Sequence, residues 1–301
     1  MRAPLVATVA CLAFAIPVLP ISSAHAEDGP PGRAAAGAVT LGQVATTGAQ
    51  GCNPGPTTMA QYLEAGPPSY LTPTAGVITS YSVQAGSTAG SVRLVLFGPS
   101  PTAGHRTVVG YSAQNPVVIN SLNTFPVRIP VAAGVSIGLN NSASSMICWG
   151  AGAAGDLVTA ASGFDPTTSN DFAPAANISS VRVNISAVLE PDADGDGFGD
   201  VSQDLCPQLK GTQAACPAPD TTVTKAPKKR STKRKAKITF TAAAGSTFTC
   251  AVDGKAAEPC TSPYKKRFKY GKHVVLITAT SQFGIVDPTP AKVKFKVVRP
   301  G

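Results

Sequence analysis

Short runs of alternating apolar and polar residues occupy most of the chain from residue 38 to residue 189. This alternation indicates β-strands with one face in a core, and turns rich in Gly, Pro and Asn separate the runs. No long segment repeats its apolar residues with the period of a helix. The clearest strands are predicted at residues 76–83, 91–97, 106–111, 116–119, 124–129, 134–139, 146–149 and 178–189.

So many short strands in one region predict an N-terminal β-sandwich over residues 38–189, with a jelly-roll-like arrangement. A second set is predicted at residues 237–242, 247–252, 274–279 and 291–298, where Asp253-Gly254 is a hairpin turn sequence. This set has the size of a small Ig-like β-sandwich, which we assign to residues 237–299. The predicted fold class is therefore all-β.

The first 26 residues have the composition of a secretory signal peptide. Arg2 supplies the positive charge, residues 5–19 form the apolar core, and Ala24-His25-Ala26 is a small-x-small cleavage site. The apolar run is too short and too interrupted by proline to span a membrane. We expect an exported protein without a transmembrane segment, secreted or associated with the cell envelope, whose mature chain begins with a disordered stretch over residues 27–37.

The cysteines agree with export. Cys11 would leave with the signal peptide, and six cysteines remain, an even number that predicts three disulfides in an oxidising compartment. Of the fifteen pairings that six cysteines allow, the region borders favour one within each region. The predicted pairs are Cys52–Cys148, Cys206–Cys216 and Cys250–Cys260.

Six of the 16 acidic residues lie in the short segment between the two predicted domains, residues 190–207. Repulsion among these carboxylates would keep the segment extended unless a cation offsets it, and Ca²⁺ takes six to eight oxygen ligands. Counted from Asp192, acids occupy positions one, three, five and nine, and Gly197 stands at position six, where a calcium loop turns sharply. The predicted metal ligands are Asp192, Asp194, Asp196, Asp200, Asp204 and the backbone carbonyl of Phe198.

The loop departs from an EF-hand, because Gln203 replaces the bidentate glutamate and no flanking helices are predicted. The run Asp-x-Asp-x-Asp-Gly-x-Gly-Asp, followed by Asp204-Leu205-Cys206-Pro207, resembles the thrombospondin type 3 calcium repeat. The resemblance covers residues 190–207 as a single repeat, within a segment that we assign to residues 190–217. It implies calcium as the cofactor, with one or two ions bound. The alternative is a solvated acidic linker between the domains.

Positive charge is concentrated at the C-terminal end. Residues 221–301 hold eighteen Lys and Arg against three acids, a net charge of +15, whereas residues 27–189 have a net charge of −1. Behind a signal peptide, such a cluster favours an extracellular or cell-envelope polyanion or glycan as partner over a specific nucleic acid. We assign residues 218–236 as a basic linker, and the alternative to polyanion binding is that this stretch is only a solvated, flexible connection. The predicted contacts are Lys228, Lys229, Arg230, Lys233, Arg234, Lys235, Lys265, Lys266 and Arg267.

Residues 220–299 resemble an Ig-like repeat that is common in exported actinobacterial proteins. The resemblance rests on Phe248-Thr-Cys250-Ala-Val-Asp253-Gly254, Pro259-Cys260-Thr-Ser-Pro263, Gly271-Lys-His273 and Asp287-Pro-Thr-Pro-Ala291. It implies an architectural or adhesive module. The basic stretch over residues 264–270 departs from the mostly neutral one of the family.

No catalytic residue is predicted. The chain lacks Gly-x-Ser-x-Gly and His-Glu-x-x-His, and the acids available to a glycosidase stand in loops: Glu64, Asp156, Asp165 and Asp171. The predicted function is that of a secreted or envelope-associated calcium-binding protein with a binding, adhesion or scaffolding role. The alternative is a secreted hydrolase acting on polysaccharide, which would require two of these carboxylates to converge in a cleft.

Overall fold

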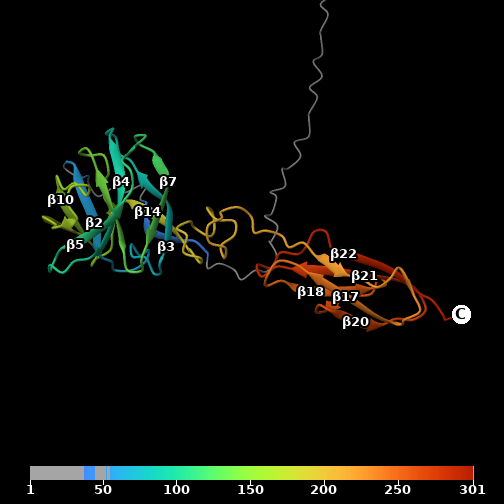
Figure 1. Ribbon diagram of the computed structural model, residues 1–301. Coiled ribbons are helices and arrows are strands. Elements are labelled where there is room, and N and C mark those ends of the chain that lie inside the picture. Colours follow the sequence, from blue (N-terminus) through green and yellow to red (C-terminus); the bar gives the residue numbers. More distant parts are fainter. Residues whose placement is uncertain (1–36, 45–51, 53–54, 301) are drawn as a thin grey trace, which may run out of the picture. The chain divides into compact units, whose positions relative to one another are not determined.

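The structure, a computed structural model, describes residues 37–44, 52 and 55–300 (Figure 1). The predicted signal peptide lies outside these residues, as does all of the predicted disordered stretch except residue 37. The described residues form strands and turns and no helix, so the all-β prediction is confirmed.

Eight strands of the N-terminal domain pair as one long antiparallel hairpin that has been rolled up. The first pairs with the last, the second with the seventh, the third with the sixth, and the fourth with the fifth. This is the pairing of a jelly roll, as predicted. In chain order the strands are β1 (Val39–Gln43), β2 (Thr57–Leu63), β3 (Gly76–Gln84), β4 (Ser91–Pro99), β5 (Arg106–Tyr111), β7 (Leu122–Val131), β8 (Ser136–Asn141) and β14 (Ile185–Glu190).

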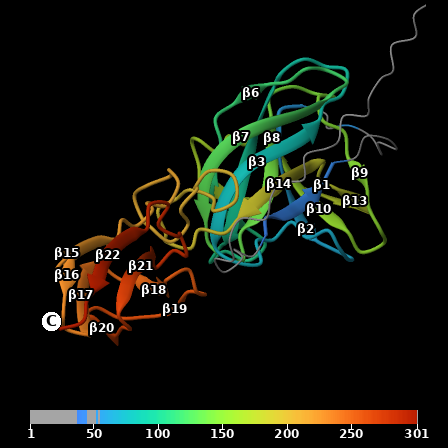
Figure 2. The ribbon, with the colours of Figure 1, turned by 90° about the vertical axis from the view of Figure 1, so that its right-hand side faces the viewer.

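These strands divide between two sheets. One has the order β1-β14-β3-β7, whose members can be followed as neighbouring ribbons in Figure 2, and the other has the order β11-β5-β4-β8-β2-β10-β12. Shorter strands extend the sheets or lie in loops. They are β6 (Asn115–Pro116), β9 (Gly150–Ala151), β10 (Leu157–Ser162), β11 (Asp171–Phe172), β12 (Ala176–Ser179) and β13 (Val181–Arg182).

The main core lies between the two sheets and includes Leu41, Ile78 and Ile137. β2 is buried on both faces, because Met59 packs in the main core while its neighbour Ala60 joins a smaller apolar cluster on the other side of the sheet. A strand that is buried on both faces shows no polar alternation. For this reason β2 does not stand out in the sequence.

Three strand predictions are wrong in detail. Of residues 116–119, only Pro116 lies in a strand, β6. Residues 146–149 form no strand and make only isolated bridges, Ile147 with Ala85 and Cys148 with Cys52. The predicted strand at residues 178–189 is broken into β12, β13 and β14, and Ser180, at the first break, has a positive φ of 58°.

The C-terminal domain is a second β-sandwich. One sheet has the order β15-β17-β20 and the other the order β16-β22-β21-β18-β19. Between them lies a core that includes Ile238, Phe240, Ile277 and Phe295. The strands are β15 (Thr222–Lys225), β16 (Arg230–Ser231), β17 (Lys235–Thr241), β18 (Thr247–Val252), β19 (Glu258–Pro259), β20 (Tyr264–Arg267), β21 (Gly271–Thr280) and β22 (Ala291–Val297).

The interpretation of residues 218–236 as a linker is wrong for this structure. The range contains β15 and β16 and the start of β17. β15 pairs with β17, and β16 pairs with β22. These short edge strands have few apolar residues, so they show no alternation of apolar and polar positions. They are strands because their backbones pair with neighbours elsewhere in the chain.

The three predicted disulfides, Cys52–Cys148, Cys206–Cys216 and Cys250–Cys260, are all present. One lies in each domain, and the third closes a short loop in the segment between them. In the part of the chain that the structure describes, no helix is long and apolar enough to cross a membrane.

Candidate metal centre

The acidic segment, residues 190–217, begins at the last residue of β14 and contains no further strand. Glu190 is 3% exposed, and both oxygens of its carboxylate accept hydrogen bonds. It accepts hydrogen bonds from the N–H groups of Val201 and Ser202 and from the hydroxyls of Ser202 and Thr79, at 2.7–3.0 Å. Burial acts to raise the pKa of Glu190, but these hydrogen bonds leave it below its usual value. Glu190 therefore anchors the segment to the sandwich.

Two further contacts tie the segment to β7, the edge strand of its sheet. Gln203 donates from Nε2 to the carbonyl of Val127 at 2.9 Å, and its Oε1 accepts the N–H of Gly199 at 3.3 Å. The guanidinium of Arg128 lies 4.1 Å from the ring centroid of Phe198. Gln203, which stands close to the place of the EF-hand glutamate, thus positions the loop.

Three aspartates surround a tight turn. Gly197 has a φ of 86°, in the left-handed region that glycine tolerates best. Asp192 accepts the N–H groups of Asp196 and Gly197, each at 3.0 Å, and Asp194 accepts the N–H of Asp196 at 3.1 Å. One carboxylate oxygen from each of Asp192, Asp194 and Asp196 lies within 4.8 Å of the other two. The turn therefore brings together the carboxylates of the three aspartates that stand at alternate positions in the sequence.

Two further aspartates of the segment, Asp200 and Asp204, are buried but are not part of this cluster of three. Asp200 accepts the N–H of Ala193 with both oxygens, at 3.2 and 3.1 Å. Asp204 is 2% exposed, and its Oδ1 accepts the N–H of Cys206 at 2.7 Å. Burial raises the pKa of Asp200, and the charges of Asp192, Asp204 and Asp194 raise it further.

Asp194 shows the same effect, because burial and then the charge of Asp196 raise its pKa, with smaller contributions from Asp204 and Asp192. The structure thus brings Asp192, Asp194 and Asp196 into one cluster, whereas Asp200 and Asp204 are not part of that cluster and interact with it through their charges. The ring of Phe198 packs against Arg128, and its carbonyl as a ligand stays a prediction.

Two carboxylate oxygens of the segment, Oδ2 of Asp194 and Oδ2 of Asp204, are buried without a hydrogen-bond partner. Lys210 lies close by but donates to the carbonyl of Gly195, at 2.8 Å. Among the described residues, none of the ion pairs includes an aspartate of this segment. An unsatisfied buried polar group costs about 1–3 kcal/mol and a charged one more, and no ion pair of the described residues offsets this cost at Asp194 or Asp204.

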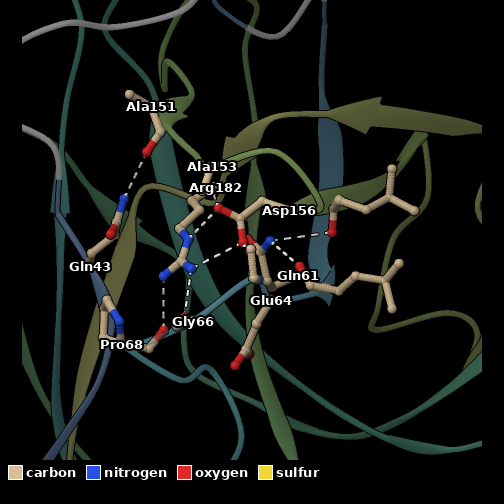
Figure 3. A network of polar contacts seen from close by, with 12 residues as sticks. Gln43, Gln61, Glu64, Gly66, Pro68, Ala151, Ala153, Asp156 and Arg182 are labelled. Carbon is tan, nitrogen blue, oxygen red and sulfur yellow. Dashed lines mark hydrogen bonds and ion pairs between the residues drawn. The ribbon is translucent and has the colours of Figure 1, made fainter.

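A buried carboxylate of the N-terminal domain, Asp156, has the opposite surroundings (Figure 3). Arg182 donates to it from Nε at 2.8 Å and from Nη2 at 3.0 Å, and also donates to the carbonyls of Pro68 and Gly66. Two backbone N–H groups complete the shell of Asp156. The hydrogen bond from Arg182 outweighs the effect of burial and lowers the pKa of Asp156 to about 2.

The other acids considered for a hydrolase also have local partners. Glu64 accepts the N–H of Tyr70, Asp165 accepts hydrogen bonds within its own turn, and Asp171 pairs with His105 at 2.9 Å. A cavity of about 360 Å³ next to His105 is lined by Tyr62, Ala103, Gly104, His105, Thr159, Pro174 and Asn177. Each of the four candidate acids thus has a local hydrogen-bond or ion-pair partner.

The nine cationic residues predicted for polyanion binding are spread over both sheets of the C-terminal domain. They are Lys228, Lys229, Arg230 and Lys233 in and around β16, Arg234 and Lys235 at the start of β17, and Lys265, Lys266 and Arg267 in β20. Eight are exposed, whereas Arg234 is half-buried and donates to the carbonyl of Phe268. The prediction left out the lysines of β21 and β22, although their alternation with core residues is visible in the sequence.

No family model matches the chain, and no curated protein matches it. A similar solved structure is described as Clostridium thermocellum CbhA fibronectin(III)-like modules. It is 19% identical, the match covers 48% of this chain and 85% of that chain, and the TM-score is 0.24. A likeness at this level carries no argument about function, and the fold described above rests on the strand pairing of this chain.

Proposed function

We propose that this chain is an exported or envelope-associated calcium-binding protein with a scaffolding role. In this proposal Asp192, Asp194, Asp196, Asp200 and Asp204 hold the ion. The observation that carries it is the buried, unpartnered Oδ2 of Asp204, a residue whose charge acts on Asp194 and Asp200. The signal-peptide composition of the first 26 residues and the three disulfides support export.

Calcium suits this donor set better than other common metals. It takes six to eight oxygen ligands in flexible geometry, whereas Mg²⁺ demands a tight octahedron and gives up water reluctantly. The two cysteines of the segment are paired with each other, and the segment has no histidine, so softer metals find no preferred ligand there. Oδ2 of Asp194 and Oδ2 of Asp204 are the first oxygens that we assign, and we propose the carbonyl of Phe198 as a further ligand.

The ion's role would be structural. Glu190 and Gln203 already fix the segment to the N-terminal sandwich, and an ion that removes the repulsion among the aspartates would hold the rest of the segment in one conformation. We expect a dissociation constant of roughly 10⁻⁴ to 10⁻³ M, because Gln203 replaces the bidentate glutamate of a tighter site. Such an affinity is sufficient where calcium is millimolar.

Calorimetric titration of the chelator-treated mature protein with CaCl₂ tests this function. The double variant Asp194→Asn/Asp204→Asn keeps side-chain size and removes two charges from the centre. The control Asp165→Asn/Glu258→Gln removes two charges from exposed positions elsewhere. Wild type and control should release the same binding heat, and the centre variant should release none. Equal binding heats in all three proteins, or no binding heat in wild type, would show that the segment is only a solvated acidic linker.

A further inference from the structure

The two sheets of the C-terminal domain turn alternate residues toward a shared core, so the residues between them point outward on opposite sides. In β17 the buried residues include Ile238 and Phe240, and in β22 they include Val293 and Phe295. The outward positions of both strands are exposed except for Thr239, which is half-buried, and most of them are lysines.

The first outer surface, which we call the β22 face, has five cations. Lys292, Lys294 and Lys296 alternate along β22, and all are exposed. Lys272 of β21 stands directly opposite Lys296, and Arg230 of β16 is paired with Lys296 from the other side. Alternate residues of a strand are about 6.6–6.8 Å apart, so the three lysines form a row about 13 Å long.

The second outer surface, the β17 face, includes four cations in two cross-strand pairs, and Lys225 of β15, opposite Thr239 of β17, adds a fifth. Lys235 of β17 stands opposite Arg267 of β20, and Lys237 stands opposite Lys265. All five are exposed.

Neither face has an acidic partner. Like charges directly opposite each other destabilise a sheet, and the two faces contain four such pairs. Of the nearby acids, Asp287 is buried and accepts the N–H of Thr221, and Asp253 pairs with His273. No lysine makes an ion pair within the described part of the chain. An anion from outside the protein would relieve this repulsion.

We propose that the C-terminal domain binds linear, phosphate-bearing polyanions on both faces, so that one protein molecule bridges two polymer strands. Rows of exposed cations neutralise charge along an extended polymer without a pocket for any single group. A flat anionic membrane reaches only one of two faces that point in opposite directions, whereas polymer strands reach both. This binding is separate from the calcium centre and goes beyond the function proposed for it.

Calorimetric titration of the mature, full-length protein with a short linear polyphosphate tests the proposal. The polymer should cover one row of lysines and be too short to wrap around the domain. Three variants lose the same charge. They are Lys292→Gln/Lys294→Gln/Lys296→Gln on the β22 face, Lys235→Gln/Lys237→Gln/Lys265→Gln on the β17 face, and Lys255→Gln/Lys269→Gln/Arg299→Gln at exposed positions outside both faces.

Wild type and the control variant should bind about two chains per protein, and each face variant about one, because counterion release is lost where the cations are lost. Each face variant should also unfold at the same temperature as wild type or higher, because it loses like-charge pairs.

Binding of a single chain by wild type would overturn the proposal, as would an equal loss in all three variants, which would mean that only net charge matters. Vesicles of phosphatidylserine and phosphatidylcholine provide the other arm of the test. If the protein binds these vesicles through one face and does not bind polyphosphate, the partner is a membrane surface and the proposal is wrong.

Discussion

Two regions of this molecule bury carboxylates, and they balance the charge in different ways. Asp156 has its own cation, since Arg182 forms a two-pronged ion pair with it and two backbone N–H groups complete the shell. The acidic segment gathers five aspartates without an ion pair among the described residues, and leaves an oxygen of Asp194 and an oxygen of Asp204 buried and unpartnered.

The difference shows which region depends on the surrounding solution. The Asp156 network is complete within the chain, so its stability should not change when calcium is added or removed. If the acidic segment binds calcium as proposed, its stability should follow the calcium concentration. This contrast yields four predictions, given from the largest expected effect to the smallest.

Replacing Asp156 by alanine should cost about 3–5 kcal/mol of unfolding free energy, because it leaves the guanidinium of Arg182 buried without its partner. Urea unfolding of the N-terminal domain measures the loss. Asp165→Ala, at an exposed turn position, should cost much less and serves as the control. A loss under about 1 kcal/mol for Asp156→Ala would show that the pair contributes little.

Acid should weaken the same network in a defined window. The pKa of Asp156 is about 2 in the folded protein and 3.8 as its ordinary value. A depressed pKa of an acid gives stability that is present above pH 4 and lost as pH falls toward 2, roughly 2 kcal/mol in all. Unfolding free energies measured between pH 5 and pH 2 should fall more steeply for wild type than for Asp156→Asn, which has no such titration. Parallel curves would contradict the prediction.

Calcium should stabilise wild type modestly. At 10 mM Ca²⁺ and a dissociation constant of about 1 mM, the gain is about 1.4 kcal/mol. Asp204→Asn should lose this gain, yet in chelator it should be at least as stable as wild type, because it removes a buried charge without a partner. Thermal unfolding with and without calcium measures both effects. If calcium stabilised Asp204→Asn as much as it stabilises wild type, Asp204 would not be a calcium ligand.

Gln203→Ala should have the smallest effect. It removes the hydrogen bond to the carbonyl of Val127, worth about 1 kcal/mol, and should do so equally with and without calcium. Because Gln203 positions the loop rather than binding the ion, the calcium dissociation constant should change less than it does for Asp204→Asn. A large loss of calcium affinity in Gln203→Ala would instead make Gln203 a ligand.

The sequence by itself determined the local features. The alternation of apolar residues predicts most of the long strands and the all-β class, because side chains of a strand alternate between core and solvent. The spacing of Asp192, Asp194 and Asp196 around Gly197 predicts that their carboxylates converge, because a glycine turn brings near neighbours together. The three disulfides could also be predicted, because the borders between the predicted regions favour one pair of cysteines within each region.

Only the tertiary structure decided the features that depend on distant partners. β2 is central yet unrecognised in the sequence, because burial on both faces removes its alternation. Arg182 and Asp156 are 26 positions apart, and nothing in their spacing predicts their pairing. Gln203 looks like a missing ligand in the sequence but is an anchor to β7, and Asp204 gains its significance from being buried without a partner. The two lysine faces likewise can be recognised only from the register of the paired strands. Pairing between strands that are distant in the sequence places like charges opposite each other.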